Sequence, residues 1–397
     1  MKNNLKLNYD DITIVPSRVS SICSRSECNP HDEDGYLPIF ASCMSSVVSI
    51  ENTQKFNEAK IRTVVPRSYS IEDRLAFLFK DYDNFVSFSL AEARDIFINR
   101  AEEYEIEGRY CARAADLFIQ RVDSVVLKRK AALKVCIDLA NGHMNCLIEL
   151  VKEIKAKFGD RVLIMTGNIA NPETYRDYEE AGVDYCRVSI GTGNVCSTSS
   201  NTAIHYPVFS LLQEIYDIKQ EVDGKCKIIA DGGIHGFRDV QKALIYADYV
   251  MIGSLFNKAI ESAGKTTYGT FYWNIRGKKI MRPLKTLFYF GREVPKEKYD
   301  NVMKLVKQNK LTVWKELFGM SHKIAQAIIN QANSQETKKL KTSEGLLKYQ
   351  KVEYNLNGWA ENETDYLRSA MSYTDSYDLE EYKDSEWVQI SKIAYNN

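Results

Sequence analysis

The chain has 397 residues, of which 44% are hydrophobic and 27% are charged, and its 53 basic side chains balance its 53 acidic ones. This composition is typical of globular proteins and excludes a disordered, collagen-like or coiled-coil chain. The zero net charge also argues against a dedicated surface for nucleic acid or an anionic membrane, which would carry a basic excess. No apolar run approaches the roughly 18 residues of a membrane span, and the first residues lack the apolar core of a signal peptide, so we expect a soluble, cytoplasmic protein.

The nine cysteines form no CxxC pair, and the five histidines occur singly, so the sequence contains no ligand spacing for zinc. We predict that eight of the nine cysteines are small packing residues in the interior. Cys196 is the exception, because it lies in a loop rich in glycine and hydroxyl residues.

Eight short, β-rich runs follow one another between residues 37 and 254. Such nearly continuous apolar runs, ending in Gly, Ser, Asn or Asp, are typical of buried parallel strands. Between them, three stretches carry apolar residues at helical spacing, namely His143–Phe158, Pro172–Ala181 and Phe237–Ala247. The predicted strands are Leu37–Ser42, Ile61–Pro66, Phe85–Leu90, Lys134–Ala140, Val162–Gly167, Tyr185–Ile190, Lys227–Asp231 and Tyr249–Ser254.

Eight strands alternating with helices predict an α/β fold, a (β/α)8 barrel of the triosephosphate isomerase (TIM) type in a single domain. The alternative is an open, doubly wound sheet, but that fold normally has a GxGxxG turn after its first strand, and LPIFASCMSS contains none. We expect an insertion at about 91–132, between strands three and four, and a flap at about 258–317, after strand eight. A C-terminal extension covers about 376–397.

The active site of such a barrel lies at the C-terminal ends of its strands. Asp231-Gly232-Gly233 and Gly253-Ser254 follow strands seven and eight, the usual phosphate-binding corner of this architecture. Glycine lets backbone N–H groups approach an anion closely, so these turns favour a phosphate site over simple tight turns.

The loop after strand six, Gly191–Ser199, contains Cys196 between glycines and hydroxyl residues. A thiolate in this position can attack an electrophilic carbon, and the nearby hydroxyl of Thr198 can carry a proton. The residues alone support equally well an incidental cysteine in a Ser/Thr-rich turn.

Four parts of the sequence resemble motifs of the IMP dehydrogenase/GMP reductase family. They are LNYDDITIVPSR near the N-terminus, LPIFASCMSSV on the first strand, GTGNVCST around Cys196, and IADGGIHGFRDVQKAL with ADYVMIGS on the last two strands. The chain leaves no room for CBS modules after PRSYS, and CIDLANGH, SRSE, FGMS, KTSEG and YLRSAMSYT are similar to the reductases. The resemblance therefore implies reductive deamination of GMP by NADPH, giving IMP, ammonia and NADP. The alternatives are an IMP dehydrogenase, which oxidises IMP to XMP with NAD, and a nucleotide-binding barrel without activity.

The resemblance also implies roles for individual residues. Cys196 would attack C2 of the purine to form a thioimidate, and Thr198 and Glu344 would transfer the proton to the leaving amine. A potassium ion would bind the backbone carbonyls of Gly191, Gly193 and Cys196, and the family's assembly implies a homotetramer. GMP would contact Asp231, Gly232, Gly233, Gly253, Ser254, Gly319, Met320, Ser321, Lys341, Thr342, Ser343 and Gly345. NADPH would contact Ser24, Arg25, Arg67, Asp138, Leu139, Ala140, Ile190, Gly191, Ser369, Ala370, Met371 and Ser372, with Arg25 and Arg67 pairing with its 2′-phosphate.

The sequence departs from the family pattern at a few positions. Ser199 stands where the family commonly has arginine, and Ala203-Ile204-His205 replaces Gly-Val-Gly. Arg67 replaces a common lysine, and the flap is longer than in typical reductases. These departures concern the potassium site, the choice of cofactor and the identity of the purine.

Overall fold

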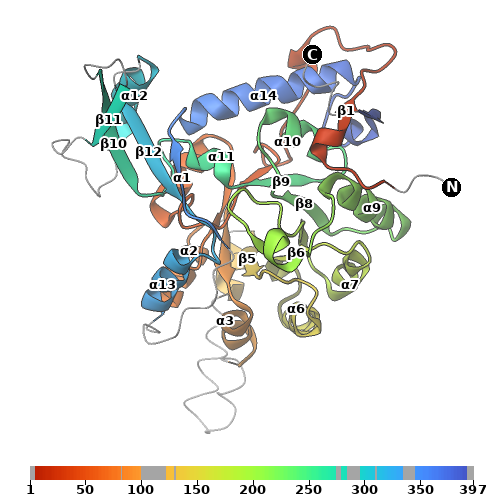
Figure 1. The fold of residues 1–397 in the computed structure, drawn as a ribbon. Helices are drawn as coiled ribbons and strands as arrows, with labels where there is room; N and C mark the ends of the chain where they lie inside the picture. Colours follow the sequence, from red (N-terminus) through yellow and green to blue (C-terminus); the bar gives the residue numbers. More distant parts are fainter. Residues whose placement is uncertain are drawn as a thin grey trace.

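The computed structural model describes residues 5–81, 83–99, 122–128, 131–273, 279–283, 296–308, 311–333 and 345–390. Eight parallel strands close into a barrel in chain order, which confirms the predicted fold (Figure 1). No predicted strand differs from the observed one by more than two residues at either end. The strands are β2 (Ile39–Ala41), β3 (Arg62–Val65), β4 (Phe85–Phe88), β5 (Leu133–Asp138), β6 (Val162–Ile169), β7 (Tyr185–Val188), β8 (Lys227–Asp231) and β9 (Tyr249–Ile252).

Alternate residues of these strands fill the interior of the barrel, as the twofold periodicity of a strand requires. Phe40, Phe85, Tyr185 and Tyr249 form an aromatic layer, with ring centroids 5.1 Å apart in the pairs Phe40–Tyr249 and Phe85–Tyr185. Further buried side chains pack against this layer, including Cys136, Met165, Ile229 and Met251. The interior is therefore a packed core at its N-terminal end, and barrels of this type bind their ligands at the C-terminal end.

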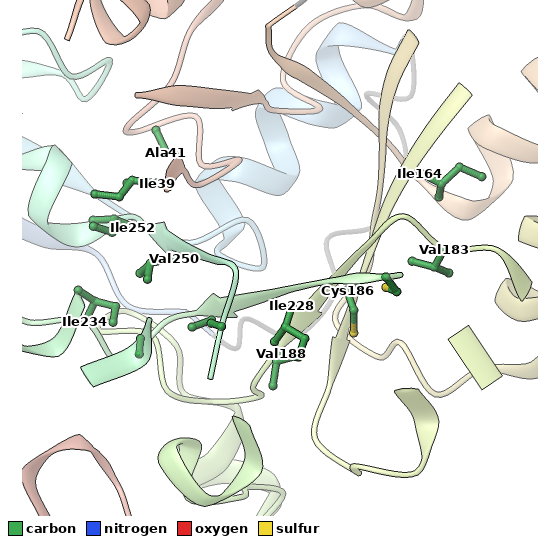
Figure 2. Packing of buried hydrophobic residues seen from close by; sticks show 14 of the residues in the cluster. Ile39, Ala41, Ile164, Val183, Cys186, Val188, Ile228, Ile234, Val250 and Ile252 are labelled. Carbon is green, nitrogen blue, oxygen red and sulfur yellow. The ribbon is translucent and has the colours of Figure 1, made fainter. Parts of the chain in front are cut away.

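The opposite faces of the strands pack against the surrounding helices. Ile39, Val188, Ile228 and Ile252 belong to this outer core and are buried. Figure 2 shows how these side chains lie on their strands. Burial of these apolar side chains is the main force that holds the helices on the barrel. The helices are α1 (Thr53–Glu58), α2 (Ile71–Leu78), α3 (Leu90–Arg94), α6 (Asn145–Phe158), α7 (Thr174–Ala181), α9 (Val208–Glu221), α10 (Phe237–Ala243) and α11 (Ser254–Asn257).

The three predicted helices are present but shorter. The first begins at Asn145 rather than His143, and α7 begins at Thr174, after a turn in which Tyr175 N–H donates to the Pro172 carbonyl. The third ends at Ala243, four residues before the predicted end, because the chain turns there to enter β9.

The predicted insertion between the third and fourth barrel strands begins with α3 and a π-helical turn, η4 (Asp95–Asn99). Residues 122–128 are helical, and Val122 is buried in the outer core. The described parts of the insertion thus pack against the barrel, and residues 100–121 and 129–130 lie outside the described residues.

The predicted flap forms a four-stranded antiparallel sheet in the order β11-β10-β12-β13, on the left of Figure 1. The predicted end at residue 317 is wrong, because β12 pairs with a strand at 348–351 in the register Leu317↔Lys348. A small core that includes Tyr268, Met303 and Val313 lies under this sheet. Its elements are β10 (Thr266–Trp273), β11 (Lys279–Pro283), α12 (Lys296–Lys307), β12 (Thr312–Leu317), α13 (Lys323–Ala332) and β13 (Lys348–Lys351).

Two short strands, one near each end of the chain, pair on the outside of the barrel. β1 (Ile12–Ile14) pairs with β14 (Trp387–Gln389), and the long helix α14 (Leu356–Tyr373) lies across α10. Trp387 anchors the C-terminal extension, since its ring packs 5.0 Å from Phe209 and its Nε1 donates to the Tyr246 hydroxyl at 2.7 Å. The extension therefore packs on the barrel, and residues 391–397 lie outside the described residues.

The prediction that eight cysteines are packing residues is wrong for two of them. Cys23 and Cys146 are exposed, whereas Cys28, Cys43, Cys136, Cys186 and Cys226 are buried. Cys146 lies in the first turn of α6 beside Leu147, which takes the core-facing position. Cys111 lies outside the described residues.

Within the ranges that the structure describes, no helix combines the length and the apolar character needed to cross a membrane.

Candidate active site

A cavity of about 300 Å³ opens at the C-terminal ends of the barrel strands, within the size range of ligand sites. The ends of seven barrel strands and one segment of the flap line it. The structure thus brings together residues that are far apart in the sequence. The predicted site residues in its lining are Arg67, Asp138, Leu139, Ala140, Ile190, Gly191, Gly193, Cys196, Thr198, Asp231, Gly232, Gly233, Gly253, Ser254, Gly319, Met320 and Ser321.

Cys196 lies in the loop that follows β7, and its side chain is half-buried at the cavity. Its Sγ lies 3.2 Å from Thr198 Oγ1 and donates a hydrogen bond to it. The backbone N–H of Cys196 donates to the Gly193 carbonyl at 2.9 Å, which closes a tight turn. This turn presents the thiol and the hydroxyl side by side to the cavity.

The start of this loop is held by Ser189, which adopts a φ of +107°. A residue other than glycine is strained when φ is positive, because its Cβ atom crowds the backbone. Contacts of the Ser189 side chain must therefore stabilise this conformation. The Ser189 hydroxyl makes two hydrogen bonds of 2.6 Å, to the backbone carbonyl of Asp231 and to Thr192 Oγ1. These bonds tie the loop to the end of β8.

Two glycines are required by this packing. Gly191 has a φ of +78°, and a Cβ atom there would lie 2.7 Å from the Cβ of Ser199. Gly232 has a φ of +103°, and a Cβ atom there would lie 2.6 Å from Thr192 Oγ1. Any larger residue at either position would displace the loop from the strand ends.

A buried arginine on β7, Arg187, connects the floor of the cavity. Its side chain is only 7% exposed, and it donates to Asp138 Oδ1 at 2.8 Å and to Asp231 Oδ2 at 2.8 and 3.0 Å. Arg187 is not among the site residues predicted from the sequence. Its position could have been noticed, because it is a charged residue inside the apolar run YCRVSI. Side chains alternate between the two faces of a strand, and this alternation directs Arg187 into the barrel.

Asp138 is held between two guanidinium groups, because Arg67 Nε also donates to it, at 3.2 Å. Burial raises the pKa of Asp138, but the positive charges of Arg67 and Arg187 outweigh burial and lower the pKa to about 2. Asp138 therefore carries its charge at neutral pH.

Asp231 receives a further hydrogen bond from Asn168 Nδ2, at 2.8 Å. All the side-chain bonds that the described residues make to Asp231 end on Oδ2. Its Oδ1 therefore remains available to accept a hydrogen bond from a ligand hydroxyl in the cavity.

A second cysteine, Cys43, also lines the cavity, and its thiol lies 3.4 Å from Asp138 Oδ1. Burial, together with the negative charge of Asp138, raises the pKa of Cys43 well above its ordinary value. Cys43 therefore stays a protonated thiol, and the half-buried Cys196 is the better candidate nucleophile.

One group of predicted cofactor residues lies outside the cavity of its own chain. Arg25, in the short helix η2 (Arg25–Glu27), pairs with Asp365 of α14 at 3.4 Å. The hydroxyl of Ser20 donates to the Ser372 carbonyl at 2.9 Å. Ser24, Arg25, Ser369, Ala370 and Ser372 therefore belong to one surface region, separate from Arg67. Met371 is fully buried in the outer core, so its side chain does not reach this surface.

A second group belongs to the flap. Lys341, Thr342, Ser343 and Glu344 lie outside the described residues. The next residue, Gly345, forms an antiparallel bridge with Cys196, and Leu346 N–H donates to the Val195 carbonyl at 2.9 Å. The flap thus meets the loop that carries the nucleophile.

Comparison with known proteins agrees with this arrangement. The profile of the family described as IMP dehydrogenase/GMP reductase domain matches residues 6–308. The GMP reductase of Vibrio parahaemolyticus is 29% identical over 275 residues, covering 67% of this chain and 72% of that protein. The GMP reductase of Streptococcus equi is 29% identical over 300 residues (70% and 83%), and that of Caenorhabditis elegans is 27% identical over 274 residues (66% and 70%). Because the family profile spans most of the chain and the barrel places the family's motifs around one cavity, the chain belongs to the IMP dehydrogenase/GMP reductase family.

Proposed function

We propose that this protein is a GMP reductase, which uses NADPH to convert GMP to IMP and ammonia in purine interconversion. The observation that carries the proposal is the pairing of Cys196 with Thr198 in a cavity that Asp231, Gly232 and Gly233 also line. The names of the related proteins support the same reaction.

Cys196 acts as the nucleophile. Its sulfur forms a bond to C2 of the purine, and the C2–N bond to the exocyclic amine breaks, which leaves a thioimidate and ammonia. NADPH supplies a hydride to C2 when it is bound. The S–C2 bond then breaks, and the sulfur regains its electron pair, so that GMP, NADPH and two protons give IMP, NADP and ammonium.

Thr198 moves protons between the thiol and the leaving amine. Its hydroxyl lies 3.2 Å from Cys196 Sγ, within reach of both the sulfur and a group bonded to it. An amine leaves readily only after protonation, and Glu344 is proposed to supply that proton through Thr198.

The anchoring of GMP uses the ends of β8 and β9. Asp231 Oδ1 accepts a hydrogen bond from a ribose hydroxyl, while Arg187 and Asn168 hold its Oδ2. The backbone of Gly232-Gly233 and of Gly253-Ser254 binds the phosphate, because a residue without a side chain allows N–H groups to approach an anion.

The nicotinamide end of NADPH fits beside this site. Leu139 and Ile190 are half-exposed apolar residues in the cavity lining, suited to one face of a flat ring, and the buried Arg67–Asp138 pair lies next to them. Ser24, Arg25, Ser369, Ala370 and Ser372 lie away from the cavity of their own chain. We therefore propose that they bind the adenosine end of a cofactor held by a neighbouring subunit, in a cytoplasmic homotetramer.

The test is a turnover screen of purine nucleotides with NADPH, read by the mass of the nucleotide product. We expect conversion of GMP to IMP and a loss of about 10⁴-fold or more in turnover in Cys196→Ala. Cys146→Ala, which removes an exposed thiol that is not part of the cavity lining, is the matched control and should keep full activity. Formation of NADH from IMP would instead indicate the dehydrogenase, and tight GMP binding without turnover in any cofactor would indicate an inactive barrel.

A further inference from the structure

The loop around Cys196 exposes backbone carbonyls, and the family resemblance assigns three of them, on Gly191, Gly193 and Cys196, to a potassium ion. Two of the three already accept hydrogen bonds from the protein. Ser199 Oγ donates to the Gly191 carbonyl at 3.0 Å, and Cys196 N–H donates to the Gly193 carbonyl at 2.9 Å.

Ser199 also fills the space beside Gly191. A Cβ atom on Gly191 would meet the Cβ of Ser199 at 2.7 Å and its backbone nitrogen at 3.0 Å. Ser199 therefore packs directly against Gly191, and its hydroxyl donates to a carbonyl oxygen that the family pattern assigns to the cation. The donor set of this chain does not fit the potassium site of the family pattern.

A positive charge nevertheless reaches the loop, from the flap. Lys348, on β13, places its Nζ 2.6 Å from the backbone carbonyl of Asn194 and 2.8 Å from Asn194 Oδ1. The side chain of Lys348 is half-buried. An ammonium group carries the same charge as a monovalent cation and donates up to three hydrogen bonds, so it can order carbonyl oxygens in the same way.

The contact of Lys348 continues a short antiparallel pairing between the flap and the loop. Gly345 bridges Cys196, Leu346 N–H donates to the Val195 carbonyl, and Lys348 then holds Asn194. Three successive residues of the loop are therefore held by one segment of the flap, and Lys348 supplies the charged contact of the three.

We propose that Lys348 and Ser199 order the catalytic loop of this protein in place of a bound monovalent cation. Lys348 is thereby a positioning residue, which acts on Cys196 through Asn194. The inference rests on the proposed function in naming this loop catalytic, but the order of the loop is measurable without turnover. If Lys348 and Ser199 replace the cation, the turnover of GMP should be the same with and without potassium.

The experiment compares the wild type with Lys348→Met, which keeps the length of the side chain and removes its charge. Lys351→Met is the matched control, because residue 351 lies on the same strand but, by strand alternation, on the other face. Hydrogen exchange of amides 191–199 and the rate of Cys196 alkylation by iodoacetamide report loop order, in potassium chloride and in tetramethylammonium chloride at equal ionic strength. Turnover of GMP is measured in the same two salts.

We expect the wild type to give the same exchange, alkylation and kcat in both salts. Lys348→Met should speed exchange of the loop amides by about tenfold or more relative to Lys351→Met, since it loses two charge-assisted hydrogen bonds. The kcat of Lys348→Met should fall by a larger factor than its KM for GMP changes, because the loop orients the nucleophile. Ser199→Ala should loosen the loop in the same direction.

Two results would overturn the proposal. One is a severalfold gain in protection or kcat of the wild type in potassium, which requires no variant to fold. The other is loop exchange in Lys348→Met equal to that of Lys351→Met. If GMP is not turned over but loop order depends on Lys348 and not on potassium, the proposed function fails and this inference stands.

Discussion

The two ends of the barrel each bury a carboxylate between two basic side chains. At the N-terminal end, Asp248 accepts hydrogen bonds from Lys219 and Lys383, each at 2.7 Å. At the C-terminal end, Asp138 accepts them from Arg67 at 3.2 Å and Arg187 at 2.8 Å. Burial raises the pKa of both carboxyl groups, and the neighbouring positive charges outweigh burial and lower each to about 2.

The difference lies in what covers each cluster. Both oxygens of Asp248 are used, since the Ile228 N–H also donates to it and the C-terminal extension brings Lys383 over it. The cluster at the other end lines a cavity and includes Asp231, whose Oδ1 accepts no side-chain hydrogen bond from the residues that the structure describes. Similar ion pairs are therefore covered by the protein at one end and line the cavity at the other.

The largest effect is expected from Arg187→Met, which leaves Asp138 and Asp231 without their shared partner. Removing one member of a buried ion pair costs about 3–5 kcal/mol of unfolding free energy, measured by denaturant titration. GMP binding by calorimetry should be lost as well. Arg187→Lys keeps the charge but not the two-pronged geometry, so it should lose less stability. Wild-type GMP affinity in Arg187→Met would contradict the binding role of this cluster.

Acid should weaken both ends together. A carboxyl group whose pKa is lower in the folded state contributes stability that is complete above its ordinary pKa of 3.8 and is lost as the pH falls to about 2. Each of Asp138 and Asp248 should account for about 2 kcal/mol over this window. The measurement is unfolding free energy against pH, and Asp248→Asn should show a shallower loss than the wild type. If the unfolding free energy of Asp248→Asn fell with decreasing pH as steeply as that of the wild type, Asp248 would have no such role.

A moderate effect is expected at the N-terminal end alone. Lys383→Met leaves Asp248 with Lys219, so we expect a loss of about 1–3 kcal/mol in unfolding free energy. The KM for GMP should stay unchanged, because this cluster is at the opposite end of the strands from the cavity. A raised KM in steady-state assays would mean that the two ends are coupled.

The smallest change in stability is expected at Arg25, whose ion pair with Asp365 is more than half exposed. Arg25→Ala should alter the unfolding free energy by about 0.5 kcal/mol or less. The KM for NADPH should nevertheless rise several-fold, since we propose that this region reaches the cofactor of a neighbouring subunit. Arg238→Ala, at another exposed ion pair, is the control. An unchanged KM for NADPH in Arg25→Ala would contradict the proposal that this region binds the cofactor.

The sequence by itself determined the barrel and most of its cavity. Apolar runs report buried strands through local periodicity, and the C-terminal ends of parallel strands meet on one rim, so Asp138, Cys196 and Asp231 were predictable as neighbours. The family resemblance added Gly319–Ser321, which the structure places in the same cavity.

Only the tertiary structure decided the contacts that cross the molecule. Arg187 serves the site because strand alternation turns it inward between Asp138 and Asp231, a pairing that no local pattern reports. The flap extends to Lys351, and Lys348 reaches Asn194, because β12 and β13 pair across a gap of 30 residues in the sequence. Such contacts depend on register and packing between distant segments, whereas sequence periodicity records only which face of each segment is buried.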